Sequence, residues 1–305
     1  MRVVMTVVEC IERSSSPIFS FEILPPLKGN DIQGVYNVVD KLREFNPSYI
    51  NITSHHNEGP RKRPGTVAIA AALQFRYGIA AVPHIICMGF TREETESALL
   101  DLNYLGIHNL LLLRGDDKGL PPVNPAVGNH YALDLQAQVN AFNRGESFDG
   151  SPIRGIDTPF AYGMACYPER HSEAPSAEAD LAIAKAKVKA GAQYLVTQMF
   201  FDNAKYFDFV DRCRRSGITV PIIPGLKPIR KIDQLQVLPK VFGCEMPEPL
   251  VRELMKCQTD EQATEVGVEW AIAQSRDLIA HGAPGLHFYT LLASDSVRRI
   301  AKVIF

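Results

Sequence analysis

One pattern repeats along almost the whole chain: a short apolar run, a few turn residues, and then an amphipathic stretch with helical spacing. The apolar runs are continuous rather than alternating, which is typical of parallel strands that are covered on both faces. Eight such runs are present, at Ile18–Leu24, Tyr49–Thr53, Ala81–Cys87, Asn109–Leu113, Phe160–Cys166, Tyr194–Phe200, Val220–Pro224 and Gly285–Tyr289. Eight strand–helix units predict an α/β fold, a (β/α)₈ TIM barrel. No Gly-x-Gly-x-x-Gly opens a helix after an early strand, which argues against an open dinucleotide-binding sheet.

Helical patterns lie between the predicted strands, and several of their ends carry recognisable caps. Thr91 stands before Arg92-Glu93-Glu94, and Gly106 and Gly191 each follow a helical stretch. The expected helices are Ile32–Phe45, Gly65–Tyr77, Arg92–Leu105, Ala132–Phe142, Ala177–Ala190, Lys205–Ser216, Thr259–His281 and Ser294–Ile304, with two shorter ones at Ile232–Leu238 and Pro247–Lys256.

Length and composition narrow the class of protein. The chain has 305 residues, 46% of them apolar and 22% charged, and barrels of roughly 250 residues commonly form one domain. We therefore expect a single barrel domain over residues 1–305. A net charge of −2 gives no electrostatic argument for a nucleic-acid or membrane partner. The six cysteines have neither disulfide-framework nor metal-ligand spacing, and the apolar N-terminal stretch is short and charged. We expect a cytoplasmic protein without a bound metal.

The barrel hypothesis also predicts where the active site lies. Catalytic residues of such barrels stand at the C-terminal ends of the strands, on one common face. Polar or charged residues occupy every such position in this chain: Glu22, Thr53, His84, Arg114 with Asp116, the segment 167–171, Gln198, Lys227, and His287 with Tyr289.

Glu22 is the candidate general acid. It is flanked by Phe21, Ile23 and Leu24, so we expect a poorly hydrated carboxyl whose pKa is raised by desolvation. The alternative is an interior glutamate paired with a lysine or an arginine, and the sequence favours neither interpretation.

The other candidates are weaker one by one, and each has a plain structural alternative. Asp116 could accept a hydrogen bond from a heterocyclic N–H or lie in a solvated turn, and Gln198 could present its amide to a ring or be a satisfied core residue. His171 could touch a phosphate or be an ordinary loop histidine. Asp180 and Lys187 share a face of one helix but could be two solvated charges. Lys227 could be a site or a surface residue. For His287 a structural role is favoured.

Taken together, the strand-end motifs resemble those of the methylenetetrahydrofolate reductase family. They occur in family order over residues 18 to 290. The matching segments are Phe-Glu-x-x-Pro-Pro at 21–26, Asn51-Ile52-Thr53, Pro83-His84-Ile85, Leu113-Arg114-Gly115-Asp116, Tyr167-Pro168-Glu169-x-His171, Thr197-Gln198-x-Phe200-Phe201-Asp202, Ile223-Pro224-Gly225 and His287-Phe288-Tyr289-Thr290.

The resemblance implies a cofactor, a reaction and a role for each matched residue. It implies a barrel that binds FAD and transfers hydride from NADH or NADPH to methylenetetrahydrofolate in two half-reactions, supplying methyl groups for methionine synthesis. Glu22 would be the acid, Gln198 would hold the pterin, and Asp116 would contact both flavin and folate. The residues implied to contact FAD are Thr53, His84, Arg114, Gly115, Asp116, Tyr167, His171, Asp180 and Lys187.

The match also has departures and leaves other functions open. Ile232 stands where bacterial relatives often have an aromatic residue, and the long C-terminal regulatory domain of eukaryotic relatives is not expected. The resemblance implies a homo-oligomer but does not choose between NADH and NADPH. The alternatives are a flavin-free barrel aldolase, lyase or folate-dependent methyltransferase, and a binding subunit without catalysis.

Overall fold

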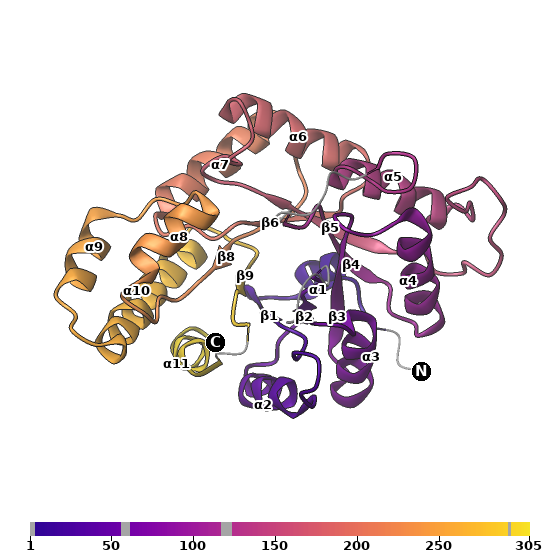
Figure 1. The fold of residues 1–305 in the computed structure, drawn as a ribbon. Coiled ribbons are helices and arrows are strands. Elements are labelled where there is room, and N and C mark those ends of the chain that lie inside the picture. Colours follow the sequence, from indigo (N-terminus) through magenta and orange to yellow (C-terminus); the bar gives the residue numbers. More distant parts are fainter. Residues whose placement is uncertain (1–3, 56–61, 117–123, 292–293) are drawn as a thin grey trace.

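The computed structural model describes residues 4–55, 62–116, 124–291 and 294–305. Its strands form one all-parallel sheet in the order β7-β6-β5-β4-β3-β2-β1-β9-β8, with helices around the outside (Figure 1). This arrangement confirms the predicted (β/α)₈ barrel. The strands are β1 (Ile18–Ile23), β2 (Tyr49–Ile52), β3 (Ala80–Ile86), β4 (Asn109–Leu113), β5 (Ala161–Cys166), β6 (Tyr194–Thr197), β7 (Ile222–Ile223), β8 (Gly225–Leu226) and β9 (Gly285–Phe288).

The predicted strand at 220–224 is instead two very short strands, β7 and β8, with Pro224 between them. β7 pairs with β6, whereas β8 pairs with β9, so this one segment links the two edges of the sheet. Gly225 is needed at the junction, because a Cβ there would overlap the carbonyl oxygen of Thr197 and the ring of Tyr289. Proline has no N–H for a ladder, which explains why the strand is interrupted at Pro224.

The helices follow the predicted pattern closely, with shifts of a few residues at their ends. Thr91 caps its helix through a reciprocal hydrogen-bonding pair with Glu94, as its sequence indicates. The helical elements are α1 (Val7–Arg13), α2 (Gln33–Leu42), η1 (Arg43–Phe45), α3 (Thr66–Tyr77), α4 (Arg92–Tyr104), α5 (Ala132–Asn143), α6 (Ala177–Lys189), α7 (Asn203–Arg215), α8 (Gln234–Phe242), α9 (Glu248–Met255), α10 (Asp260–Ala280) and α11 (Ser294–Ile304). None of the helices described is long and apolar enough to cross a membrane.

Helix α1 was not expected from the sequence. Thr6 and Glu9 cap each other at its start, a Thr-x-x-Glu signature that could have revealed it. The backbone N–H of Val7 donates to the side-chain oxygen of Asn109, at 3.1 Å, and the amide of Asn109 donates to the carbonyl of Met5. Because Val7 is buried with inward-facing strand residues, α1 closes the N-terminal end of the barrel.

Candidate active site

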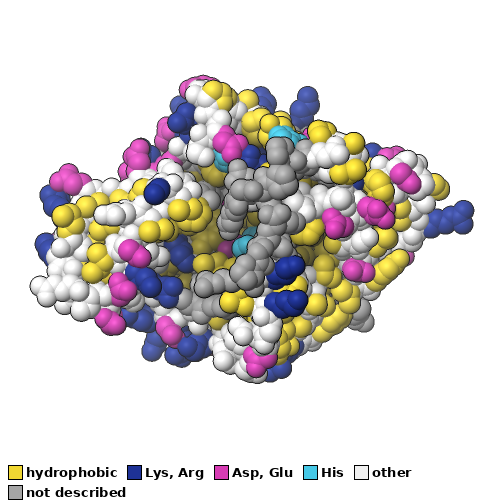
Figure 2. All heavy atoms as spheres, viewed as in Figure 1, with side chains coloured by type: hydrophobic (Ala, Val, Ile, Leu, Met, Phe, Trp, Pro, Cys, Tyr) yellow, Lys and Arg dark blue, Asp and Glu magenta, His cyan; other side chains and the backbone are white. Residues whose placement is uncertain are grey.

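Strand β1 separates the two cores of the barrel by simple alternation. Phe19, Phe21 and Ile23 belong to the apolar layer between the strands and the outer helices. Ile18 belongs to the smaller cluster inside the barrel, so Ser20 and Glu22, which alternate with the outward residues, also face inward. Glu22 is thereby placed near the C-terminal end of the strand, inside the barrel. In Figure 2 this side of the molecule has a hollow near its centre, edged by hydrophobic and histidine side chains.

Glu22 is a buried carboxyl with a strongly perturbed acidity. Its exposed fraction is 7%, and desolvation raises its pKa to about 8, against an opposing effect of the nearby Lys227 charge. Its Oε2 lies 3.5 Å from Nε2 of His84. Burial lowers the pKa of His84 to about 3, so the histidine is neutral and this contact is not an ion pair. At pH 7 the Glu22 carboxyl is therefore mostly protonated, by about ten to one.

Lys227 is the residue whose position the sequence could not decide. It follows β8, its exposed fraction is 9%, and its ammonium donates to the carbonyl oxygen of Tyr289 at 2.8 Å. Burial and the charge of Arg230 lower its pKa to about 8, while Glu22 opposes the shift. The surface interpretation is wrong. Because a cation favours the carboxylate form, Lys227 limits the rise in the pKa of Glu22.

The segment after β4 holds three of the predicted residues. Gly115 has φ +90°, a conformation that favours glycine, and a Cβ there would be in tight contact with Ile86 and Met88, at 3.3 Å. Arg114 donates two hydrogen bonds to Glu173, at 2.6 and 2.7 Å. Asp116 is exposed at the end of this segment.

The loop after β5 and helix α6 bring four further predicted residues together. The rings of Tyr167 and His171 meet edge to face with centroids 4.6 Å apart. Asp180 accepts a hydrogen bond from the backbone N–H of His171 at 2.9 Å. Lys187 is 9% exposed and donates to the carbonyl of Ala165 at 2.8 Å. The interpretation of Lys187 as a solvated charge is therefore wrong: this face of α6 packs against the end of β5.

Two predicted polar residues stand at the ends of β2 and β6. Thr53 is buried, and its hydroxyl lies 3.0 Å from Nε2 of His55. Gln198 is half-buried, and its side-chain oxygen accepts from the N–H of Met199 at 2.9 Å. Each residue directly follows the C-terminal end of its strand.

The structure shows the surroundings of His287 and Ile232, two residues whose roles the sequence left open. His287 is fully buried in β9, and its Nδ1 lies 3.0 Å from the hydroxyl of Ser20, which fits the structural role favoured for it. Ile232 is half-buried and packs against an apolar cluster that includes Met199 and Phe201. No ring stands at position 232 itself, whereas Tyr289 is an aromatic residue at the mouth.

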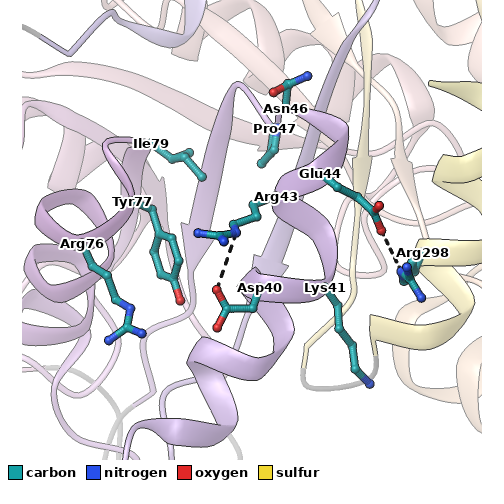
Figure 3. A pocket seen from close by; sticks show the side chains of 10 residues that line it. All are labelled: Asp40, Lys41, Arg43, Glu44, Asn46, Pro47, Arg76, Tyr77, Ile79 and Arg298. Carbon is teal, nitrogen blue, oxygen red and sulfur yellow. Dashed lines mark hydrogen bonds and ion pairs between the residues drawn. The ribbon is translucent and has the colours of Figure 1, made fainter.

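A separate surface cavity of about 790 Å³ lies around the ends of α2, η1 and α3, beside residues that precede β2 and β3 (Figure 3). It is therefore near the N-terminal ends of the strands, opposite the predicted site. Two of its positive charges face carboxylates: Arg43 lies 3.7 Å from Asp40, and Arg298 lies 2.8 Å from Glu44. We assign no ligand to it. Among the residues described, no three His, Cys, Asp or Glu side chains are grouped to hold a metal ion.

Comparison with known proteins shows which family this chain resembles over most of its length. Residues 7–304 match the model of the family described as methylenetetrahydrofolate reductase. The chain belongs to the methylenetetrahydrofolate reductase family. This confirms the resemblance drawn from the strand-end motifs, and the enzyme class that it implies, an oxidoreductase.

Individual relatives agree with the family assignment. The chain is 34% identical to the 5,10-methylenetetrahydrofolate reductases of Salmonella typhimurium and Escherichia coli, over 89% of this chain and 85% of each relative. It is 32% identical to a probable methylenetetrahydrofolate reductase (NADPH) of Caenorhabditis elegans, over 96% of this chain but only 43% of that protein.

A solved structure supports the fold alone. An uncharacterised Clostridium thermocellum protein, described as binding two copies of 5-methyl-5,6,7,8-tetrahydrofolic acid, has a TM-score of 0.61 and covers 97% of both chains at 15% identity. At this identity the likeness shows a shared architecture and assigns no ligand to the present chain.

Proposed function

We propose that this protein reduces 5,10-methylenetetrahydrofolate to 5-methyltetrahydrofolate with NADH or NADPH, through bound FAD, in two successive half-reactions. The product would supply methyl groups for methionine synthesis, and the enzyme would work in the cytoplasm as a homo-oligomer. One observation carries the proposal: a buried, protonated carboxyl, Glu22, stands at the barrel mouth of a chain from this family.

The reaction needs an acid, and Glu22 meets that need. Opening the five-membered ring of the folate to a reactive iminium requires a proton on a ring nitrogen. A carboxyl with a pKa of about 8 keeps its proton at neutral pH, yet gives it up more readily than a hydroxyl would. Lys227 then stabilises the carboxylate that remains, because its ammonium is the charge that opposes the raised pKa of Glu22.

The residues at the mouth fit a flavin, which when bound would supply the hydride transfer between nicotinamide and folate. Gly115, at φ +90°, lets the segment after β4 pack closely on Ile86 and Met88, which would hold the backbone that faces the cofactor in place. Lys187 and Arg114 provide positive charge for phosphates, and Tyr167 a ring for packing. We assign cofactor binding to Thr53, His84, Arg114, Gly115, Asp116, Tyr167, His171, Asp180 and Lys187.

The folate would contact a smaller set of side chains. We propose that the amide of Gln198 pairs with the pterin edge, since an amide presents a donor and an acceptor together. Asp116, exposed after β4, would lie between flavin and folate, and Glu22 would face the ring nitrogen.

A two-step experiment tests the function. The purified protein, supplemented with FAD, is mixed with NADH or NADPH while flavin absorbance is followed, and methylenetetrahydrofolate is then added under anaerobic conditions. We expect bleaching by one or both nucleotides and reoxidation by the folate with formation of methyltetrahydrofolate. Failure to bind FAD would favour a flavin-free barrel enzyme. FAD binding without nucleotide oxidation would favour a binding subunit.

A further inference from the structure

Several polar side chains stand inside this barrel around Glu22. Barrel interiors are normally filled by layers of apolar side chains, and Ile18, Val82, Leu111, Val196 and Ile223 follow that rule here. On β1, β2, β3 and β9, however, inward positions carry Ser20, Tyr49, Asn51, His84 and His287, each of them at most 5% exposed.

The hydrogen bonds of this group are incomplete. The hydroxyl of Ser20 forms a hydrogen bond with Nδ1 of His287. The His287 ring stacks on the Tyr49 ring, with centroids 6.0 Å apart and planes 8° from parallel. Five other buried atoms have no hydrogen bond of good geometry among the described residues: the hydroxyl of Tyr49, both amide atoms of Asn51, and Nε2 of His84 and of His287. Ser20 lies near enough to the Tyr49 hydroxyl to oppose the rise in the pKa of that group. Buried polar groups normally have partners, so such a concentration points to a polar ligand.

The residues that carry these atoms are neighbours across the strands of the barrel. In the strand register, Ser20 stands beside both Tyr49 and His287. Glu22 stands beside Asn51, and its carboxyl is 3.5 Å from His84. Helix α1 covers the N-terminal end of the barrel interior, and a buried water molecule satisfies polar groups of this kind with two to four hydrogen bonds.

We propose that Tyr49, Asn51, His84 and His287 enclose a cluster of ordered water molecules that hydrogen-bonds to Glu22 and positions its carboxyl. The cluster donates to the carboxylate and accepts from the protonated acid, so Glu22 has partners before and after it gives up its proton. The residues involved are positioning residues, and this role rests on the proposed function of Glu22. The ionisable groups that interact with Glu22 are His84 from β3, Lys227 after β8 and Tyr289 after β9. His287 from β9 and His55 after β2 act in turn on His84.

The first test does not depend on activity. A high-resolution crystal structure of the protein should show water within hydrogen-bonding distance of Asn51 and His84. Tyr49→Phe removes one hydroxyl and keeps the stacked ring; with water present it should lower Tm by about 2 °C. A dry interior would overturn the proposal, and Tyr49→Phe would then raise Tm, because a buried polar atom without a partner is removed.

The second test asks whether the water reaches Glu22. Asn51→Leu should move the alkaline limit of the folate half-reaction upward by about one pH unit, since the carboxylate loses donors, and should leave nucleotide oxidation unchanged. Tyr194→Phe is the matched control, because its hydroxyl already donates to the carbonyl of Leu110. An unshifted profile in Asn51→Leu would refute the link. If the wild type reduces no folate, the proposed function fails, and the crystal structure and Tm alone decide on the water cluster.

Discussion

Replacing Glu22 by glutamine separates proton donation from every other role of this residue. The amide has the same size and stays neutral, so the packing at 7% exposure is preserved, but it has no acidic proton. General acid catalysis contributes about 10²–10⁴ in rate, which corresponds to about 3–5 kcal/mol of activation free energy. The folate half-reaction should slow by that factor, while nucleotide oxidation and FAD binding stay near the wild type.

The wild-type pH dependence follows from the same geometry. With a pKa of about 8 for Glu22, the protonated fraction falls from about nine-tenths at pH 7 to about one-tenth at pH 9. The folate half-reaction should therefore slow by about tenfold over this range, and Glu22→Gln should remove the dependence. Stopped-flow absorbance of the flavin at a series of pH values measures both half-reactions separately. Glu44→Gln, a surface carboxyl outside the barrel, serves as the control.

Two results would refute this reasoning. Equal slowing of both half-reactions in Glu22→Gln would mean that the residue maintains the site rather than donating a proton. A wild-type folate half-reaction that is flat between pH 7 and pH 9 would mean that Glu22 does not titrate where its burial beside Lys227 places it.

Three further predictions follow from the same structure. Burial lowers the pKa of both His84 and His287 to about 3 from 6.5, so on acidification the unfolded chain binds protons at these residues before the folded chain does. The contribution of the two neutral histidines to the free energy of unfolding should therefore be complete above pH 6.5 and fall as the pH drops toward 3. At pH 5 the loss should be about 2 kcal/mol per histidine. Urea denaturation at pH 5 and pH 8 should show a smaller loss in His287→Asn, and an equal loss would contradict the neutral buried state. Gly115→Ala, which forces a Cβ against Ile86 at positive φ, should weaken FAD binding at least tenfold by flavin fluorescence titration, and unchanged affinity would place the cofactor elsewhere. Lys227→Met removes the cation that lowers the pKa of Glu22, so the alkaline limit of the folate half-reaction should rise; a fall would reverse the assigned electrostatics.

Local sequence determined much of this protein. Continuous apolar runs separated by helical patterns fix parallel strands covered by helices, because each unit can bury its apolar surface only in that way. The apolar neighbours of Glu22 were enough to predict a poorly hydrated carboxyl, and the pKa of about 8 agrees with this. The positions of Arg114 and Gln198 at strand ends followed from the same repeat.

Tertiary structure alone decided which side chains meet inside the barrel. The division of one strand into β7 and β8, the closure of the lower end by α1, and the burial of Lys227 beside Glu22 leave no periodic trace in the chain. Only the structure shows which side chains stand next to Glu22: Asn51 beside it in the strand register, and His84 at 3.5 Å. The physical reason is the separation of the contacting residues along the chain. Periodicity reports the surroundings of neighbouring residues, whereas these contacts join strands separated by tens to hundreds of positions. Their energies also depend on the low dielectric that only the closed barrel creates.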